Sequence, residues 1–323
     1  REHLAMYLVA MRRDVDDPTT VTEFARKLRG RQRLRTLYLL TVADLSTTSP
    51  TSMTRWKASM LESLFRATNN LFDGDSPGDP SRLKRMREEA ALHWNTELDQ
   101  RFLDEFCNTM PERYLLSNTS AEIAAHAKVA FEVQNEPVTA AIVPSRHPDV
   151  AELCVVTQGS PADEAGLCVV AGDRPGLLAG ITAALAANRL DIFAAQIHSR
   201  RMSDGALQAV DLFWVRDPVE GPAGVEAALP KLKRDLRNVI RGRVAPRELL
   251  QGRKPARWSE RPSSSVPTEI TIDQSASPQH SVIEVTTKDK AGVLFTIAQA
   301  LHDLGLSIAL AKISTECTRA TDV

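Results

Sequence analysis

Two stretches of the sequence decide the fold: DRPGLLAGITAALAANRLDIFAAQIHS at 173–199 and DKAGVLFTIAQALHDLGLSIALAKIST at 289–315. They align without a gap at an offset of 116 residues, and ten of the 27 aligned positions are identical. Each stretch opens with a loop of the pattern D-[RK]-x-G-[LV]-L, continues as a helix and ends in an apolar strand. Such a repeat indicates two copies of one small unit that pack on one another.

The first unit is predicted to occupy residues 150–242, because strand signals flank its copy of the repeat and a second helix follows. We expect the isolated run PTEITID at 267–273 to return to this sheet as its fourth strand. The flanking elements are predicted strands at 138–143, 151–157, 166–172 and 207–217 and a predicted helix at 222–241.

The second unit is predicted at residues 281–323, where a strand, a helix and a strand follow one another. Its next strand should start where the chain reaches Val323, so we expect the unit to lack its last two strands and a helix. Between the units, residues 243–266 are rich in Arg, Pro and Ser and predict a linker with room for one helical turn.

Residues 1–135 are predicted to be helical throughout, because apolar side chains recur at helical spacing with charges between them. Breaks are expected at 16–18, 47–50 and 73–81, where Asp, Ser, Gly and Pro cluster. The run SNTS at 117–120 is typical of a helix start, since its hydroxyls can cap free amides. The predicted fold class is α+β, with an all-helical N-terminal region ahead of two small mixed units, the second truncated.

The composition, 43% apolar and 25% charged, is that of an ordinary globular protein. The net charge of −1 gives no general electrostatic footprint for nucleic acid or an anionic membrane. No run approaches the ~18 apolar residues of a membrane span, and the N-terminus shows no signal-peptide cleavage pattern. We therefore expect a cytoplasmic protein, and the absence of a starting Met suggests that the chain begins inside a longer one.

The four cysteines, Cys107, Cys154, Cys168 and Cys317, make no CxxC pair, which disfavours a structural zinc site. Cys154 and Cys168 each lie in an apolar run that predicts a strand. We expect the cysteines to be small buried hydrophobes in a reducing cytoplasm.

The loop that opens each repeat has features suited to a small amino acid. The free N–H groups in the first turn of a helix bind anions, an Asp at the start can cap them, and Gly176 and Gly292 let backbone or ligand come close. A carboxylate could lie on the amides and an ammonium on carbonyls or an acidic side chain. The alternative is a capped helix with a packing glycine, but two copies in the same frame favour binding.

Both repeats resemble ACT domains, the ferredoxin-like βαββαβ modules that bind amino acids in metabolic regulators. The resemblance covers about 166–242 with the strand at 267–273, and then 281–323. ACT modules usually pair edge to edge and bind ligand at their interface. The second copy departs from the pattern at Ala291, where a Pro is common. The resemblance implies effector contacts at Asp173, Arg174, Gly176, Leu177, Asp289, Lys290, Gly292 and Val293.

Three local patterns precede the repeats: HLAM at 3–6 with RRDVDDP at 12–18, LLTVAD at 39–44 with Trp56-Lys57, and PERYLLSN at 111–118. In this order, ahead of two ACT-like units, they resemble the bifunctional PII uridylyltransferase/uridylyl-removing enzymes of bacterial nitrogen control. The resemblance runs over essentially the whole chain. In that family a nucleotidyltransferase domain and an HD-type metal phosphohydrolase domain precede tandem ACT domains.

The family resemblance makes residues 1–135 the C-terminal part of the HD-type domain. It implies Asp44 as a ligand of Mg²⁺ or Mn²⁺, and the alternative is a helix-end Asp bonded to the turn at 46–49. No His-Asp pair lies upstream of Asp44, where the only His is His3, and the paired carboxylates of a nucleotidyltransferase are also missing. We therefore predict that this chain alone neither uridylylates nor hydrolyses.

The resemblance also implies what the intact protein does. It transfers UMP from UTP to a tyrosine of the PII signalling protein and removes it again, and glutamine acts on the sensor modules as allosteric effector. The alternative function is a non-catalytic amino-acid-binding regulator with a helical dimerisation region. A nucleic-acid binder is disfavoured by the charge balance.

The histidines carry weaker signals. His126 is predicted to pack inside the helical region, and His198 is a candidate for an interface or ligand contact. The dipeptide His302-Asp303 lies in the helix of the second unit and predicts a solvated face. His3 is expected to be structural, with the lining of a hydrolase cleft as the alternative.

Overall fold

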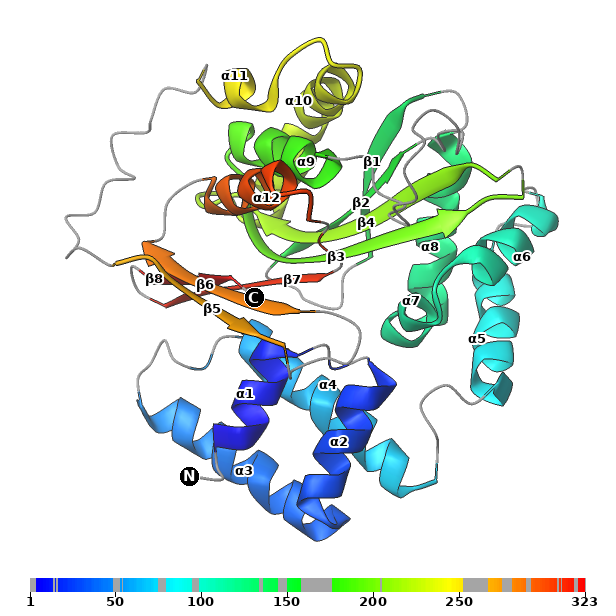
Figure 1. The fold of residues 1–323 in the computed structure, drawn as a ribbon. Helices are drawn as coiled ribbons and strands as arrows, with labels where there is room; N and C mark the ends of the chain where they lie inside the picture. Colours follow the sequence, from blue (N-terminus) through cyan, green and yellow to red (C-terminus); the bar gives the residue numbers. More distant parts are fainter. Residues whose placement is uncertain are drawn as a thin grey trace.

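The structure is a computed structural model in which helices cover both faces of a continuous antiparallel sheet (Figure 1). It describes residues 4–13, 15, 17–48, 53, 55–74, 80–94, 99–133, 136–144, 150–157, 176–203, 205–251, 267–274, 281–288, 292–306, 308, 310–316 and 319–322. The helices are α1 (Leu4–Arg12), α2 (Pro18–Leu28), α3 (Arg31–Thr48), α4 (Arg55–Phe72), α5 (Pro80–His93), α6 (Gln100–Thr109), α7 (Glu112–Ser117), α8 (Ser120–Glu132), α9 (Leu177–Ala187), α10 (Pro222–Ile240), α11 (Pro246–Gln251) and α12 (Val293–Asp303). The strands are β1 (Val138–Val143), β2 (Ala151–Thr157), β3 (Asp191–Arg201), β4 (Leu207–Arg216), β5 (Glu269–Asp273), β6 (Val282–Lys288), β7 (Leu310–Glu316) and β8 (Arg319–Asp322).

The helical prediction for the N-terminal region is confirmed by α1–α8, and the three predicted breaks fall between helices; the further boundaries at 29–30, 94–99 and 110–111 were not predicted. α2 begins at Pro18, where the Asp17 carboxylate accepts hydrogen bonds from the first free backbone N–H groups. α8 begins with a capping box between Thr119 and Glu122, within the predicted helix start. The helices α1–α4 enclose a core of their own, which includes Met6, Leu34, Leu61 and Leu64.

The sheet has eight strands in the order β1-β2-β4-β3-β7-β8-β6-β5, and each neighbouring pair is antiparallel. The strands β1-β2-β4-β3 form one module and β5-β6-β8-β7 form the second. Both have the same strand order when they are counted from the outer edge of the sheet inward. The edge strands β3 and β7 join the two modules, and α9 packs against α12 on one face of the sheet (Figure 1). The two repeats therefore form a side-by-side pair, the arrangement expected of ACT-like modules.

The junction between the modules has the symmetry of the repeat. Ala195 of β3 lies opposite Ala311 of β7, which follows it by 116 residues, the offset between the two copies. Gln196 and Leu310 form the next pair. A residue that pairs with its own copy across an antiparallel junction lies on a two-fold axis, so the modules are related by an internal pseudo-two-fold.

Two expectations about the strands are wrong. Residues 267–273 do not supply the fourth strand of the first sheet, because β5 pairs with β6 in the second module and β1 takes the outer position beside β2. A short β1–β2 connection closes with less loss of entropy than a return of the chain from beyond α11. The second module is also more complete than expected, since β8 lies between β7 and β6. The strand predicted at 166–172 lies outside the described residues.

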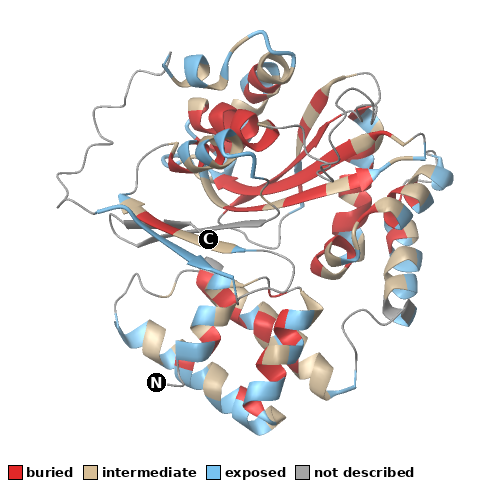
Figure 2. Cartoon of the chain, viewed as in Figure 1, coloured by how far each residue is buried: buried red, intermediate tan, exposed pale blue. Residues whose placement is uncertain are grey.

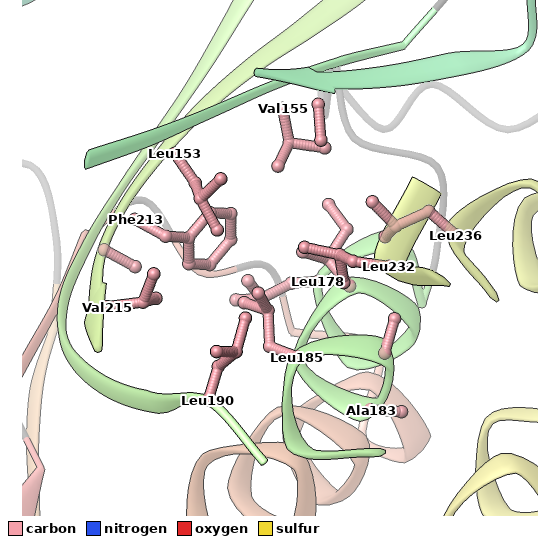
Figure 3. Packing of buried hydrophobic residues seen from close by; sticks show 14 of the residues in the cluster. Leu153, Val155, Leu178, Ala183, Leu185, Leu190, Phe213, Val215, Leu232 and Leu236 are labelled. Carbon is pink, nitrogen blue, oxygen red and sulfur yellow. The ribbon is translucent and has the colours of Figure 1, made fainter. Parts of the chain in front are cut away.

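The core of the first module lies between its sheet and the helices α9 and α10 (Figures 2 and 3). Leu178 and Leu185 of α9 point toward Leu153 and Phe213 of the sheet. Each such side chain, fully buried, contributes about 1.5–3 kcal/mol of transfer free energy. The whole of α9 up to Ala186 is buried, because α10, α11 and α12 also contact it. This helix is therefore a fixed support for the loop that precedes it.

The position of β1 can be tested with a pair of matched substitutions. Ala140 lies opposite Val155, and Ile270 takes the equivalent place opposite Val285. Ala140 is fully buried under α10, whereas Ile270 is 63% exposed. Ala140→Glu should lower the free energy of unfolding in urea by about 3 kcal/mol or more, because it buries an unpaired charge. Ile270→Glu should change it by less than about 0.5 kcal/mol.

If residues 267–273 instead completed the first sheet, the larger loss would follow Ile270→Glu and Ala140→Glu would be tolerated. The comparison thus separates the observed strand order from the one expected from the sequence.

Candidate effector site and its contacts with the helical region

The loops that open the two repeats end in glycine turns, from which the helices α9 and α12 start. Gly176 and Gly292 precede α9 and α12 with φ angles of +84° and +82°, a left-handed conformation that favours glycine. Neither glycine supplies a side chain to cap its helix, and the N–H groups at the start of a helix are the groups that can bind an anion. The next residues, Leu177 and Val293, are buried anchors of the two helices.

Half of the predicted effector residues fall within these described turns. Gly176, Leu177, Gly292 and Val293 lie at the helix starts, in equivalent positions of the two modules. The charged members of the prediction, Asp173, Arg174, Asp289 and Lys290, lie outside the described residues.

Each loop faces the end of the helix from the other module. A Cβ placed on Gly176 would lie 3.2 Å from Nε2 of His302, near the C-terminal end of α12. A Cβ placed on Gly292 would lie 3.9 Å from Cβ of Ala186, near the C-terminal end of α9. Ala186 and His302 are themselves separated by the repeat offset of 116 residues. The pseudo-two-fold therefore creates two equivalent contacts between a glycine turn of one module and a helix end of the other.

The expectation that His302 lies on a solvated face is wrong. Its ring is half-buried and rests against Gly176, because α12 runs antiparallel to α9 across the pseudo-two-fold. Its neighbour Asp303 is exposed and forms an ion pair with Arg247 of α11, whose Nη2 lies 3.7 Å from Oδ2. Sequence periodicity alone does not reveal a contact between helices of different modules.

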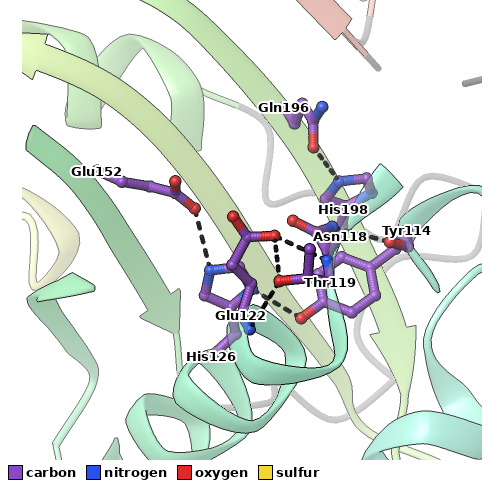
Figure 4. A network of polar contacts seen from close by, with 8 residues as sticks. All are labelled: Tyr114, Asn118, Thr119, Glu122, His126, Glu152, Gln196 and His198. Atoms are coloured by element: carbon purple, nitrogen blue, oxygen red, sulfur yellow. Dashed lines mark hydrogen bonds and ion pairs between the residues drawn. The ribbon is translucent and has the colours of Figure 1, made fainter. Parts of the chain in front are cut away.

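The opposite face of the first sheet meets the helices α7 and α8 through a buried polar network (Figure 4). The Tyr114 hydroxyl lies 2.8 Å from Nδ1 of His126, and Nε2 of that ring lies 3.2 Å from a carboxylate oxygen of Glu152 on β2. A carboxylate oxygen only accepts, so His126 donates to Glu152. Burial raises the pKa of Tyr114 well above its usual value, so its hydroxyl keeps the proton that it can donate to His126.

The junction strand β3 belongs to the same buried layer. The ring of His198 makes an edge contact with Tyr114, with centroids 5.1 Å apart, and Arg113 donates a hydrogen bond of 3.2 Å to the carbonyl of Ile197. Arg200 is 1% exposed; it donates to Gln208 and Thr109 and lies over the rings of Phe102 and Phe106. One strand therefore contacts the second module at its edge and the helical region on its face.

Burial shifts two titratable groups of this layer. Desolvation, helped by the nearby charge of Arg113, lowers the pKa of His198 to about 3, so this ring is neutral in the fold near pH 7. Desolvation also lowers the pKa of Arg200 to about 10, which leaves the guanidinium charged at that pH. Within the described part of the chain, Nδ1 of His198 and Nη2 of Arg200 have no hydrogen-bond partner.

The sequence pattern gave a partial signal for this layer. His126 was expected to pack, but its two hydrogen bonds were not foreseen. Glu152 and Arg200 were not singled out, although a charged residue within an otherwise apolar strand is a sign of a buried partner. Their helix partners, His126 and Thr109, lie 26 and 91 residues away in the sequence, so local spacing could not identify them.

Asp44 lies within α3 and is partly exposed. Its carbonyl accepts hydrogen bonds from the hydroxyls of Thr47 and Thr48 in the last turn. Among the residues that the structure describes, no group of three His, Cys, Asp or Glu side chains could hold a metal ion. The described residues therefore do not make up a metal site around Asp44, and His3 lies outside them.

Two of the four cysteines can be placed. Cys107 and Cys154 are buried free thiols, and burial raises the pKa of Cys107 to about 11 and that of Cys154 well above its usual value. They are protonated at neutral pH and pack as small apolar groups. Cys168 and Cys317 lie outside the described residues.

The comparisons with known proteins agree with this division into modules. A family model of an ACR9-like, ACT-like domain matches residues 269–323, which begin with β5 and so support its place in the second module. Curated relatives named bifunctional uridylyltransferase/uridylyl-removing enzyme match 99–100% of the chain. The chain is related over its full length to these enzymes. No solved structure matches it.

Three uridylyltransferase/uridylyl-removing relatives illustrate the match. The proteins of Phenylobacterium zucineum and Gluconobacter oxydans are 30% and 32% identical to 99% of the chain, and the match covers 32% of each relative. The protein of Azospirillum brasilense is 33% identical over the whole chain, which covers 33% of it. The chain thus spans about a third of the length of these relatives. Across the described segments, no helix combines the length and apolarity needed to cross a membrane.

The buried His198 predicts a pH dependence of stability. The unfolded ring has a pKa of about 6.5, so between that pH and about 3 the unfolded chain binds a proton that the folded chain does not. Stability should therefore fall as the pH drops below about 6.5, by up to ~1.4 kcal/mol per pH unit from this group. Urea unfolding between pH 7.5 and pH 5 measures the slope, which should be shallower in His198→Gln.

The matched control is His93→Gln, because His93 is exposed at the end of α5. An equal change of slope in both variants, or in neither, would show that His198 is not held neutral in the fold.

Proposed function

We propose that the chain is the sensor-bearing part of a bifunctional enzyme that uridylylates and de-uridylylates the PII signalling protein. In this proposal the whole protein transfers UMP from UTP to a tyrosine of PII and removes it by hydrolysis. The two paired modules bind glutamine, and the bound amino acid shifts the balance between the two activities. The full-length match to relatives that carry the bifunctional name supports the enzyme class.

The observation that carries the sensor role is the pseudo-symmetric module pair. Two glycine turns, at Gly176 and Gly292, start helices that receive no side-chain cap from the glycine and face the opposite helix ends across one interface. Free amides suit the carboxylate of an amino acid. A site built from both modules also links ligand binding to the way the modules sit together.

A ligand can shift a conformational equilibrium only as far as its affinity for the two states differs. Here β3 connects the interface to the rest of the chain, because it pairs with β7 at its edge and carries His198 and Arg200 against α6 and α7 on its face. A change in the β3–β7 junction would alter this buried layer. We infer that this is how the sensor pair acts on the helical region.

Metal chemistry in the proposed enzyme needs residues that the described chain does not supply. Asp44 is proposed as one ligand of Mg²⁺ or Mn²⁺, and the others would have to come from elsewhere in the whole protein. The chain of 323 residues should therefore show no phosphodiesterase turnover with Mn²⁺ above a buffer blank. Turnover that is lost in Asp44→Asn but kept in Asp303→Asn, a carboxylate far from α3 in sequence, would contradict this.

Glutamine binding can be measured directly by calorimetry on the purified chain. Glutamine should release or absorb heat and raise the melting temperature, because a ligand that binds only the folded state stabilises it. Glutamate is the matched control, since it keeps both main-chain groups and changes only the side-chain amide. The absence of heat and of any thermal shift would count against a sensor role.

A further inference from the structure

A groove of about 1120 Å³ lies between the helical region and the second module. One wall comes from α1, α2 and α3, and the other comes from β5 and β6, on the side of the sheet away from α12 (Figure 1). An ion pair joins the two walls, since Nη2 of Arg12 lies 3.0 Å from Oε1 of Glu284. Ligand pockets commonly lie at domain boundaries and have volumes of about 300–1,000 Å³. The groove therefore has the position and roughly the size of a ligand site.

The helix wall of the groove is positively charged. Four cationic side chains line it: Arg12, Arg13, Lys27 and Arg33. The first two are already paired with carboxylates. Lys27 and Arg33 are exposed, and neither forms an ion pair with a side chain that the structure describes. These two cations are therefore available to an anion.

The positive charge extends over the α2–α3 hairpin. Residues 24–43 carry six Arg or Lys side chains and no Asp or Glu, although the net charge of the whole chain is −1. A local excess of one sign of charge raises the local concentration of ligands of the opposite sign. The overall charge balance therefore gives no sign of this patch.

The groove also offers an apolar surface and hydrogen-bond acceptors. Leu8 of α1 and Leu40 of α3 line it and remain 41% and 51% exposed. Thr271, Asp273 and Glu284 line the strand wall. Hydroxyl and carboxylate oxygens accept hydrogen bonds from the O–H and N–H groups of a ligand. Charge, apolar surface and acceptors thus occur in one groove.

We propose that this groove binds a nucleoside phosphate, the ligand class that matches all three features. The phosphates lie against Lys27 and Arg33, the base lies on the apolar surface of Leu8 and Leu40, and ribose hydroxyls donate to the strand wall. The inference goes beyond the proposed function, because the groove is separate from the glycine turns at α9 and α12. A nucleotide bound between the walls would hold the second module against α3, the helix that carries Asp44.

Calorimetry with UTP on the purified chain tests the site. One molecule of UTP should bind per chain. Uridine lacks the phosphates that the two cations attract, and inorganic triphosphate lacks the apolar body. Each should therefore bind about tenfold more weakly than UTP, or weaker still.

Two matched pairs of substitutions within α3 locate the site. Arg33→Gln should weaken UTP binding about tenfold or more, because it removes a charged hydrogen-bond donor from the groove. Arg35→Gln removes the same charge from an exposed residue that does not line the groove, and should change the affinity less than about twofold. Leu40→Asp should also weaken binding, far more than Leu39→Asp at an exposed neighbour outside the groove.

The outcomes separate this inference from the proposed function. If UTP does not bind at millimolar concentration, the inference is overturned while the glutamine-sensor proposal stands. Equal weakening by Arg33→Gln and Arg35→Gln also overturns it, because UTP would then respond to diffuse positive charge. Triphosphate that binds as tightly as UTP overturns the assignment of a nucleoside. If Arg33→Gln does not fold, the comparison of Leu40→Asp with Leu39→Asp decides the question.

Discussion

The pairing of β3 with β7 is the interaction on which the rest of the architecture depends. An exposed edge strand presents unpaired backbone groups, and here two edges satisfy one another at Ala195 and Ala311. Because these residues are copies of each other, the pairing fixes a pseudo-two-fold axis. The same axis brings α9 and α12 together in antiparallel orientation and sets each glycine turn against the opposite helix end. The candidate sites exist only because the two edges meet in this register.

The first module is buried on both faces, and the two faces are different in kind. On one face α9 and α10 pack an apolar core, which fixes the helix after Gly176. On the other, α6–α8 meet the sheet through Tyr114, His126, Glu152 and Arg200. A buried polar group is costly unless it is hydrogen-bonded, so this layer tolerates only a few arrangements. A layer with few allowed arrangements can couple a change in the module pair to a change in the helices α6–α8.

The sequence predicted the elements that depend on local patterns and missed those that depend on distant partners. The repeat gave both helices and their following strands, and periodicity gave α1–α8, because these follow from spacing within a short window. It gave both outer strands but not their partners: residues 267–273 were expected beside the first sheet, whereas β1 takes that place and β5 pairs with β6. The contact of His302 with Gly176 was missed for the same reason.

The sequence predicted the two glycine turns of the candidate site but not the residues that lie opposite them. The loop pattern identified Gly176 and Gly292, since a left-handed turn before a helix requires glycine. The aligned repeats carry Ala186 and His302 at equivalent positions. Only the antiparallel packing of α9 and α12 shows that each of these residues contacts the glycine of the other module.

The central claim, that the two repeats pair in register through β3 and β7, is tested most directly by a disulfide between cysteines at positions 195 and 311. The chain would carry Ala195→Cys and Ala311→Cys, with its four native cysteines replaced by alanine. Opposite residues of an antiparallel pair have Cα atoms about 4.5–5.5 Å apart, within the range of a disulfide. Oxidation should give a rapid link within one chain, and much less link when the second cysteine is at Ser314. Equal linking in both proteins, or linking only between chains, would contradict the account.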